Sequence, residues 1–248
     1  MSSYSLYPKI NINGYDNEAF LGYCNILNQI KAKINKDDFI LVLDCYIGVD
    51  INHILENFKS LNFDNIILSD DYALKEDKLT EKMQDYLTDD RVFGIMNTKK
   101  LQDFFIKERL EEVKNKVNSL KGKTLIIGVG ASLITTGDLY IYADISRWEI
   151  QLRYRKGMTN WNVSNSDAPI LEKYKRGYFM EWRIADRHKI AKYENFDYIL
   201  DTNIINEPKM VTKDAFFNGI LQASKQPFRL VPYFDSGVWG GQWLKKVC

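Results

Sequence analysis

The sequence predicts an α/β fold, a three-layer parallel sheet with helices on both of its faces. Short apolar runs such as 39–44 and 124–129 have the composition of strands that are buried on both faces. Segments with helical spacing of apolar residues separate these runs, so the two kinds of segment alternate along the chain. Strands alternating with helices form right-handed crossovers, which cover both faces of a parallel sheet.

Each element is predicted from its own pattern. Five strands are expected at 39–44, 65–69, 124–129, 138–144 and 198–201. Helical segments are expected at 16–34, 51–61, 75–87, 101–120 (one helix or a pair), 145–156 and 212–224. Asp50 stands where it can cap the second of these helices. The short tail 227–244 is aromatic and ends in a Gly-Gly turn, which predicts an edge strand and turn beyond a domain boundary near Lys225.

Composition narrows the classes of function. The 248 residues are 45% hydrophobic, enough to bury a full core. The 34 basic residues nearly cancel the 33 acidic ones, so the net charge of +1 gives no general attraction to nucleic acid or to a membrane surface, and neither is expected as a partner. Residues 1–15 lack the apolar region of a signal peptide, and no apolar run has the length of a membrane span. We therefore expect a cytoplasmic protein.

Metal and nucleophile signals are weak. The three cysteines lie far apart with no CxxC spacing, and the two histidines, His53 and His188, are distant from each other and from the cysteines. We therefore predict no metal site in this chain. No GxSxG elbow or Cys/His pair indicates nucleophilic hydrolysis.

The loop 44–50 follows the first core strand, where open α/β sheets bind phosphates at a helix N-terminus. A P-loop needs glycines, a lysine for the phosphates and a Ser/Thr hydroxyl for magnesium. Only Gly48 fits, since no lysine or hydroxyl side chain of that kind follows before Asn57, and Asp50 would repel phosphate. Gly48 is a candidate phosphate-binding residue; the alternative is an ordinary turn between strand and helix.

The acidic turn after the second strand is the candidate catalytic site. Asp70 and Asp71 lie at a strand end, where two adjacent carboxylates could bind magnesium or a sugar hydroxyl or act as a base. The alternative is a solvated turn that precedes the next helix.

Two arginine-rich stretches are candidate phosphate-binding segments, because guanidinium groups contact phosphate in a bidentate manner. The first, 147–155, contributes Arg147, Arg153 and Arg155. The second, 174–189, contributes Arg183 and Arg187, which are four residues apart and share a helix face. The alternative in both stretches is a set of structural ion pairs on solvated helices.

The order of these segments resembles the uridine kinase group of P-loop kinases. The strand with Asp70-Asp71-Tyr72, the strand 138–144 followed by the arginine helix, and the stretch 197–203 carry this resemblance, which covers most of 39–224. It implies a P-loop kinase-like fold, with a nucleotide and magnesium as candidate ligands. The absent lysine and Ser/Thr imply that the phosphate loop is degenerate.

A second resemblance covers nearly the whole chain. Stretches 90–94, 103–105, 128–134, 142–155, 175–189 and 232–244 are similar to the upstream module of long bacterial class I mannose-6-phosphate isomerase-like proteins. In that family a kinase-like module precedes a cupin isomerase, whose zinc is held by residues downstream of a Trp-Gly-Gly segment like Trp239-Gly-Gly241. The resemblance implies a domain at 1–225, with 1–36 as a helical extension, and a linker at 226–248 leading to the cupin. Zinc would then be bound only outside this chain.

Three functions follow as hypotheses. The first is a non-catalytic kinase-like module of sugar-phosphate metabolism that binds a small phosphorylated ligand or supports the cupin. The second is an active but unorthodox nucleoside or sugar kinase, with Asp70 or Asp71 as base and the arginines as counter-charge. The third is an interaction module that pairs with a downstream cupin or with a second copy through residues 228–248.

Overall fold

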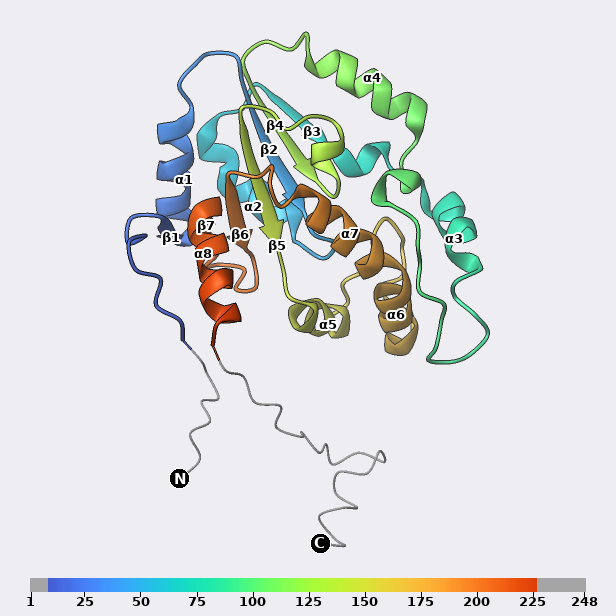
Figure 1. The fold of residues 1–248 in the computed structure, drawn as a ribbon. Helices are drawn as coiled ribbons and strands as arrows, with labels where there is room; N and C mark the ends of the chain where they lie inside the picture. Colours follow the sequence, from blue (N-terminus) through green and yellow to red (C-terminus); the bar gives the residue numbers. More distant parts are fainter. Residues whose placement is uncertain (1–8, 227–248) are drawn as a thin grey trace, which may run out of the picture.

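The five expected strands form the parallel part of a sheet in the computed structural model, which describes residues 9–226 (Figure 1). They run parallel in the order β3-β4-β2-β5-β6. Their bounds are β2 (Phe39–Cys45), β3 (Asn65–Leu68), β4 (Lys123–Gly128), β5 (Leu139–Asp144) and β6 (Tyr198–Asp201). The predicted α/β fold class is confirmed, and the five predicted strands are parallel to one another.

The sheet has an antiparallel edge that the sequence did not predict. β7 (Lys209–Thr212) pairs antiparallel with β6, and β1 (Ala19–Leu21) pairs antiparallel with β7, which completes seven strands within residues 9–226. Residues 19–21 had been expected to be helical. Their pairing with β7, and the edge-on packing of Phe20 against Tyr198 at 6.2 Å, override the local helical spacing. A wholly parallel sheet was therefore wrong.

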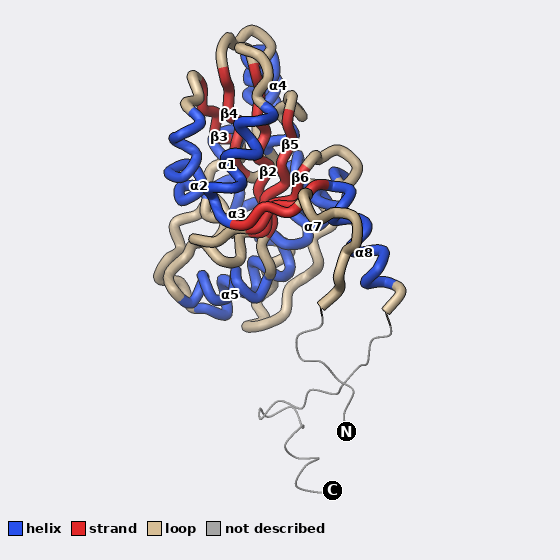
Figure 2. The backbone as a smooth tube through the Cα atoms, turned by 90° about the vertical axis from the view of Figure 1, so that its left-hand side faces the viewer, coloured by secondary structure: helices blue, strands red, loops and turns tan. Residues whose placement is uncertain are grey.

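Helices cover both faces of the sheet, as predicted (Figures 1 and 2). On one face α1 and α2 lie together, where Tyr23 packs against His53 and Phe58. On the other face α7 and α8 meet, where Tyr193 packs against Phe216 and Phe217. The bounds are α1 (Gly22–Lys33), α2 (Ile51–Phe58), α3 (Glu76–Gln84), α4 (Lys107–Val117), α5 (Arg147–Arg155), α6 (Ile170–Arg176), α7 (Trp182–Lys192) and α8 (Lys213–Ser224).

Short helical turns connect several elements. A π-helical turn, Gly177–Glu181, joins α6 to α7, and 3-10 turns occupy Lys59–Leu61, Ser69–Tyr72, Leu101–Phe104 and Ala131–Leu133. The predicted segment 101–120 is therefore a 3-10 turn followed by α4, the pair rather than the single helix. Residues 1–36 were predicted as a helical extension; their described part, 9–36, contributes β1 to the sheet and α1 to its face.

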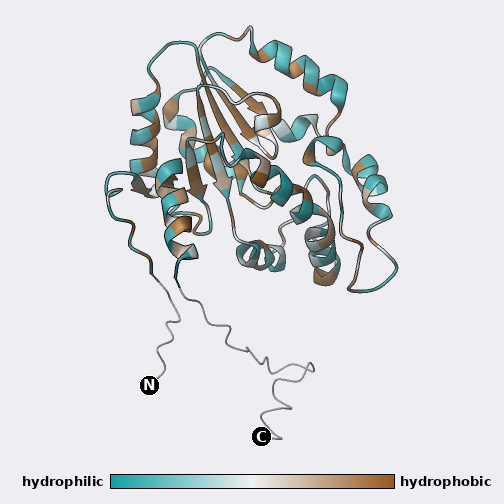
Figure 3. Cartoon of the chain, in the orientation of Figure 1, coloured by the Kyte–Doolittle hydropathy of each residue, from teal (hydrophilic) through white to brown (hydrophobic). Residues whose placement is uncertain are grey.

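The core lies between the sheet and these helices. The strand residues Leu41, Leu43, Ile126 and Ile141 are completely buried, and Figure 3 shows apolar strands beneath helices with polar outer surfaces. Within residues 9–226, no helix combines the length and the apolar character that a bilayer span requires. The aromatic tail and the predicted linker, 227–248, lie outside the described residues.

Candidate functional site

A cavity of about 940 Å³ opens at the carboxyl edge of the sheet. After β2 the chain crosses to the face of the sheet that α2 covers, and after the neighbouring strand β5 it crosses to the opposite face, which α7 covers. Open α/β sheets bind ligands between two such neighbouring strands, whose connections go to opposite faces. The loop after β2, the turn after β3 and the start of the loop after β4 line one part of the cavity. Helix α5 and the segment 156–162 line another part.

The structure brings together four of the residues predicted from the sequence. Gly48, Asp70, Asp71 and Arg153 all line this cavity although they come from three separate segments of the chain. The carboxyl ends of β2 and β3 supply the first three, and α5 supplies Arg153. The structure therefore places these four residues around one cavity at the strand ends.

The other four arginines lie outside the cavity lining and bind elsewhere. Arg147 forms an ion pair with Asp186, which Arg183 also approaches at 3.4 Å. The guanidinium of Arg187 donates to the carbonyl oxygens of Asn97 and Lys99.

Arg155 points to a different partner again. Its Nε donates to the Tyr174 hydroxyl at 2.6 Å. The five arginines predicted to bind phosphate therefore do not gather at one site, because their helix faces point in different directions.

The loop after β2 is closed rather than open. Tyr46 and Ile47 are buried at 3% and 2% exposure, so their side chains pack inside the protein. Gly48 has φ of +106°, and a Cβ at this position would lie 2.8 Å from Ile150 of α5. Glycine is needed here for close packing against α5 and for the left-handed backbone.

Arg153 contacts this loop, but its guanidinium is bonded to protein acceptors. Its guanidinium donates to the carbonyl oxygens of Gly48 at 3.1 Å and Thr202 at 2.8 Å, and its Nε pairs with Glu149 at 3.1 Å. Its side chain is only 12% exposed. Arg153 thus holds α5 against the loop, and its donors are engaged by protein acceptors.

The N-terminus of α2 carries its own acidic cap. The Asp50 carboxylate accepts a hydrogen bond from the His53 amide at 2.9 Å, as the sequence predicted. In a P-loop the amides at this helix end face phosphate. Here a carboxylate occupies part of that position, and it repels an anion.

Asp70 is the most perturbed carboxyl group in the cavity lining. Its Oδ1 accepts from the Trp161 indole at 2.6 Å and its Oδ2 from the Val129 amide at 3.0 Å. Burial raises the pKa of Asp70 to about 6 despite these two hydrogen bonds, and the charge of Asp44 adds to the rise. Asp71 is exposed beside it. Asp70 can therefore exchange a proton near neutral pH.

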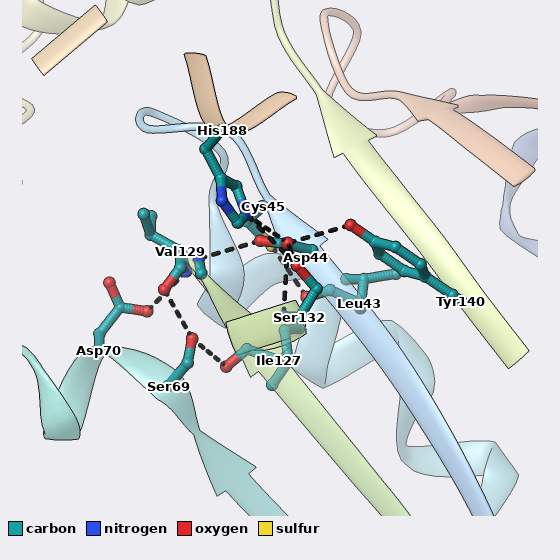
Figure 4. Close-up of polar contacts among 11 residues, drawn as sticks. Leu43, Asp44, Cys45, Ser69, Asp70, Ile127, Val129, Ser132, Tyr140 and His188 are labelled. Atoms are coloured by element: carbon teal, nitrogen blue, oxygen red, sulfur yellow. Dashed lines mark hydrogen bonds and ion pairs between the residues drawn. The ribbon is translucent and has the colours of Figure 1, made fainter. Parts of the chain in front are cut away.

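A buried carboxylate that the sequence did not single out, Asp44, organises the same strand ends (Figure 4). Asp44 is fully buried at the end of β2 and accepts from the Gly130 amide at 2.9 Å, the Tyr140 hydroxyl at 3.1 Å and the Ser132 hydroxyl. His188 of α7 places Nε2 2.7 Å from the same carboxylate. Burial alone would raise the pKa of Asp44, but the charge of His188 and these hydrogen bonds hold it below its usual value.

This Asp44 cluster is not arranged as a catalytic triad. A triad histidine uses one ring nitrogen for the acid and the other for the nucleophile. Here Nε2 of His188 faces both Asp44 and the Ser132 hydroxyl, the latter at 3.3 Å. The cluster instead joins β2, β5, α7 and the loop after β4. The signal in the sequence was a lone acid that ends an otherwise apolar strand.

One comparison identifies a family. The family described as Domain of unknown function (DUF8485) matches residues 22–225. The chain belongs to the DUF8485 family. A search of curated proteins finds no match. The DUF8485 match includes all the residues that line the cavity and the entire Asp44 cluster.

A second buried network supports the far wall of the cavity in this DUF8485 domain. Glu181, fully buried at the end of the π-helical turn, pairs with Arg176 at 2.9 Å. It also accepts from Asn160 at 2.9 Å and from the Trp161 amide at 3.1 Å. Since Trp161 holds Asp70, the π-helical turn fixes the segment that covers the acidic turn.

The described residues contain few side chains that could coordinate a metal ion together. Within residues 9–226 there is no group of three or more His, Cys, Asp or Glu side chains placed to hold a metal ion. The two adjacent carboxylates of the acidic turn, Asp70 and Asp71, differ in burial, and Asp70 already accepts hydrogen bonds from two donors.

Proposed function

We propose that this DUF8485 domain is a P-loop kinase-like module that does not transfer phosphoryl groups and binds a small hydroxylated ligand in the cavity at the carboxyl edge. The strand order supports the fold. Numbered along the chain, the parallel strands lie in the order 2-3-1-4-5, which differs from the dinucleotide-binding and flavodoxin-like orders and leaves the kinase-like fold as the one that the sequence resemblance supports.

The conformation of the loop after β2 supports the proposed loss of phosphoryl transfer. The loop after β2 is filled by Tyr46 and Ile47, and Arg153 binds the carbonyl oxygen of Gly48 instead of pointing at a ligand. Asp50 caps α2 where a β-phosphate would be bound. The loop therefore offers ATP a carboxylate where a kinase offers a lysine.

The charges of the cavity favour an uncharged ligand. Its ionisable lining comprises four carboxylates, from Asp50, Asp70, Asp71 and Glu149, and two cations, from Arg153 and Lys156. Arg153 is paired with Glu149. The surplus of acceptors suits a ligand that donates hydrogen bonds through hydroxyl groups, such as a hexose, and the similarity to mannose-6-phosphate isomerase-like proteins supports the same ligand class. A phosphorylated sugar would find Lys156 as its counter-charge.

Calorimetric titration tests the proposal. We expect a neutral hexose such as mannose to bind and magnesium-ATP not to bind. Asp71→Asn should weaken hexose binding at least tenfold, because the substitution removes the negative charge and replaces one acceptor oxygen with an NH2 donor. Asp89→Asn, an exposed aspartate outside the cavity lining, is the matched control. Robust transfer of phosphate from ATP to a hexose would refute the proposal.

A second candidate function is the unorthodox kinase. The pKa of Asp70, about 6, suits a general base at neutral pH, and the residue lines the cavity. In this case Asp70→Asn would abolish ATP-dependent phosphorylation of a hexose or nucleoside while Asp89→Asn would not change it. Equal turnover by the two variants would reject this role.

A further inference from the structure

A second cavity, of about 500 Å³, opens at the carboxyl edge of the sheet on the face that α7 and α8 cover (Figure 1). Helix α7 contributes Asp186 and Lys189 to its wall, and α8 contributes Phe216. Within residues 9–226, Asn203 is the one residue common to the linings of the two cavities. The second cavity is therefore a neighbouring but separate candidate site.

One wall of the second cavity is a row of side chains on three neighbouring strands. Asp144 of β5 is in register with Asp201 of β6, and Asp201 is in register with Lys209 of β7. Residues in register project to the same face of a sheet, and opposed residues of an antiparallel pair have Cβ atoms about 5 Å apart. Ile199 and Val211, each two residues away along its strand, are also opposed and line the same cavity. The wall thus combines a charged row with apolar side chains.

Two ion pairs use four of the six charged side chains in this lining. Lys189 of α7 pairs with Asp144 of β5. Arg147 of α5 pairs with Asp186 of α7, whose carboxylate also accepts from the Tyr46 hydroxyl at 2.8 Å. These contacts join α7 to β5 and to α5, and they neutralise the four charges within the protein.

The other two charges, on Asp201 and Lys209, are opposed across β6 and β7 but form no ion pair within residues 9–226. The Oδ1 atom of Asp201 accepts from the amide and the side-chain nitrogen of Asn203. In the described part of the chain its Oδ2 atom accepts from no donor, and the exposed Lys209 ammonium donates to no acceptor. One anionic and one cationic group therefore line the same cavity without a partner there.

We propose that the second cavity binds an apolar α-amino acid, whose ammonium contacts Asp201 and whose carboxylate contacts Lys209. An α-amino acid carries both charges on one carbon atom, so it can lie between two opposed side chains of neighbouring strands. A simple anion would be repelled by Asp201, and a simple cation would be repelled by Lys209. The apolar lining of Ile199, Val211 and Phe216 suits an apolar side chain on the ligand.

Calorimetric titration of the full chain with L-leucine, L-methionine and L-phenylalanine tests this site. We expect at least one of these amino acids to bind. Two analogues of that amino acid then test the two charges; for L-phenylalanine, 3-phenylpropanoate lacks the ammonium and 2-phenylethylamine lacks the carboxylate. Each analogue should bind at least about tenfold more weakly, because one charge-assisted hydrogen bond is lost.

Two substitutions assign the contacts. Asp201→Asn should weaken amino-acid binding at least about tenfold, but it should not weaken binding of the analogue that lacks the ammonium. Lys209→Gln should weaken amino-acid binding by a similar factor, but it should not weaken binding of the analogue that lacks the carboxylate. Asp89→Asn and Lys31→Gln, at exposed positions outside the cavity lining, are the matched controls and should leave binding unchanged.

Three outcomes would overturn the amino-acid site. The first is the absence of binding by all three amino acids, and the second is equal binding of an amino acid and both of its analogues. The third is unchanged amino-acid binding by both Asp201→Asn and Lys209→Gln, which would place the ligand elsewhere on the protein. Circular dichroism of each variant establishes that the fold is kept, so that a change in affinity reports the contact alone.

Discussion

Replacing Asp70 by asparagine should make the protein's stability less sensitive to pH. Burial raises the pKa of this carboxyl from 3.8 to about 6. Below the lower value Asp70 is protonated in both the folded and the unfolded chain. As the pH rises above 3.8, Asp70 ionises first in the unfolded chain, which lowers the free energy of the unfolded state relative to the folded state. This continues until Asp70 also ionises in the folded state, near pH 6. Native stability is therefore lost between these two pKa values.

The size of this effect follows from the shift. A pKa that rises from 3.8 to about 6 on folding lowers the free energy of unfolding by about 3 kcal/mol, and this loss is complete above about pH 7. About half of this loss in the free energy of unfolding occurs below about pH 5, so about 1.4 kcal/mol is lost between about pH 5 and pH 8. Asparagine does not titrate, so the variant lacks this loss. It also loses one acceptor for Trp161 or Val129, but that cost is the same at every pH.

Urea unfolding of both proteins at several pH values measures the difference. The free energy of unfolding of Asp70→Asn, relative to wild type, should rise by about 1.4 kcal/mol from about pH 5 to pH 8. Asp71→Asn is the control for the loss of one negative charge on the same turn. A relative stability of Asp70→Asn that does not vary with pH would refute the burial of an ionisable Asp70.

Three further substitutions test the packing around the cavity. Ser132→Ala should lower the free energy of unfolding in urea by about 2 kcal/mol at neutral pH, and by less in acid, where Asp44 protonates only as the pH falls through its lowered pKa. Glu181→Gln should cost about 3–5 kcal/mol in the same assay, because Arg176 stays buried without a counter-charge. Gly48→Ala should lower the melting temperature, with a loss of about 1–3 kcal/mol from its positive φ and the contact with Ile150.

The sequence predicted the elements whose pattern is local. β2 and β4 are runs of apolar residues long enough to be recognised, and Asp50 caps α2 as its position indicated. β1 and β7 could not be found in this way. They are three and four residues long, and they become strands only by pairing with each other and with β6.

The candidate site was predictable in place but not in role. Strand ends located Gly48, Asp70 and Asp71 at one cavity, since parallel strands end at the same edge. The partner of each arginine depends on which loop packs against its side of the helix. The spacing of residues within 147–155 and 174–189 does not predict that packing. The Asp44 cluster was missed for the same reason, because Asp44, Ser132 and His188 come from three distant segments.

Two buried carboxylates, Asp44 and Glu181, hold segments that line the cavity. In a P-loop the bound phosphates organise the loop amides. Here Asp44 binds the Gly130 amide and Glu181 binds the Trp161 amide, and both segments then contact Asp70 through Val129 and Trp161. Internal carboxylates thus supply the acceptors for these backbone donors. These contacts within the protein position Val129, Trp161 and Asp70, three of the residues that line the strand-end cavity.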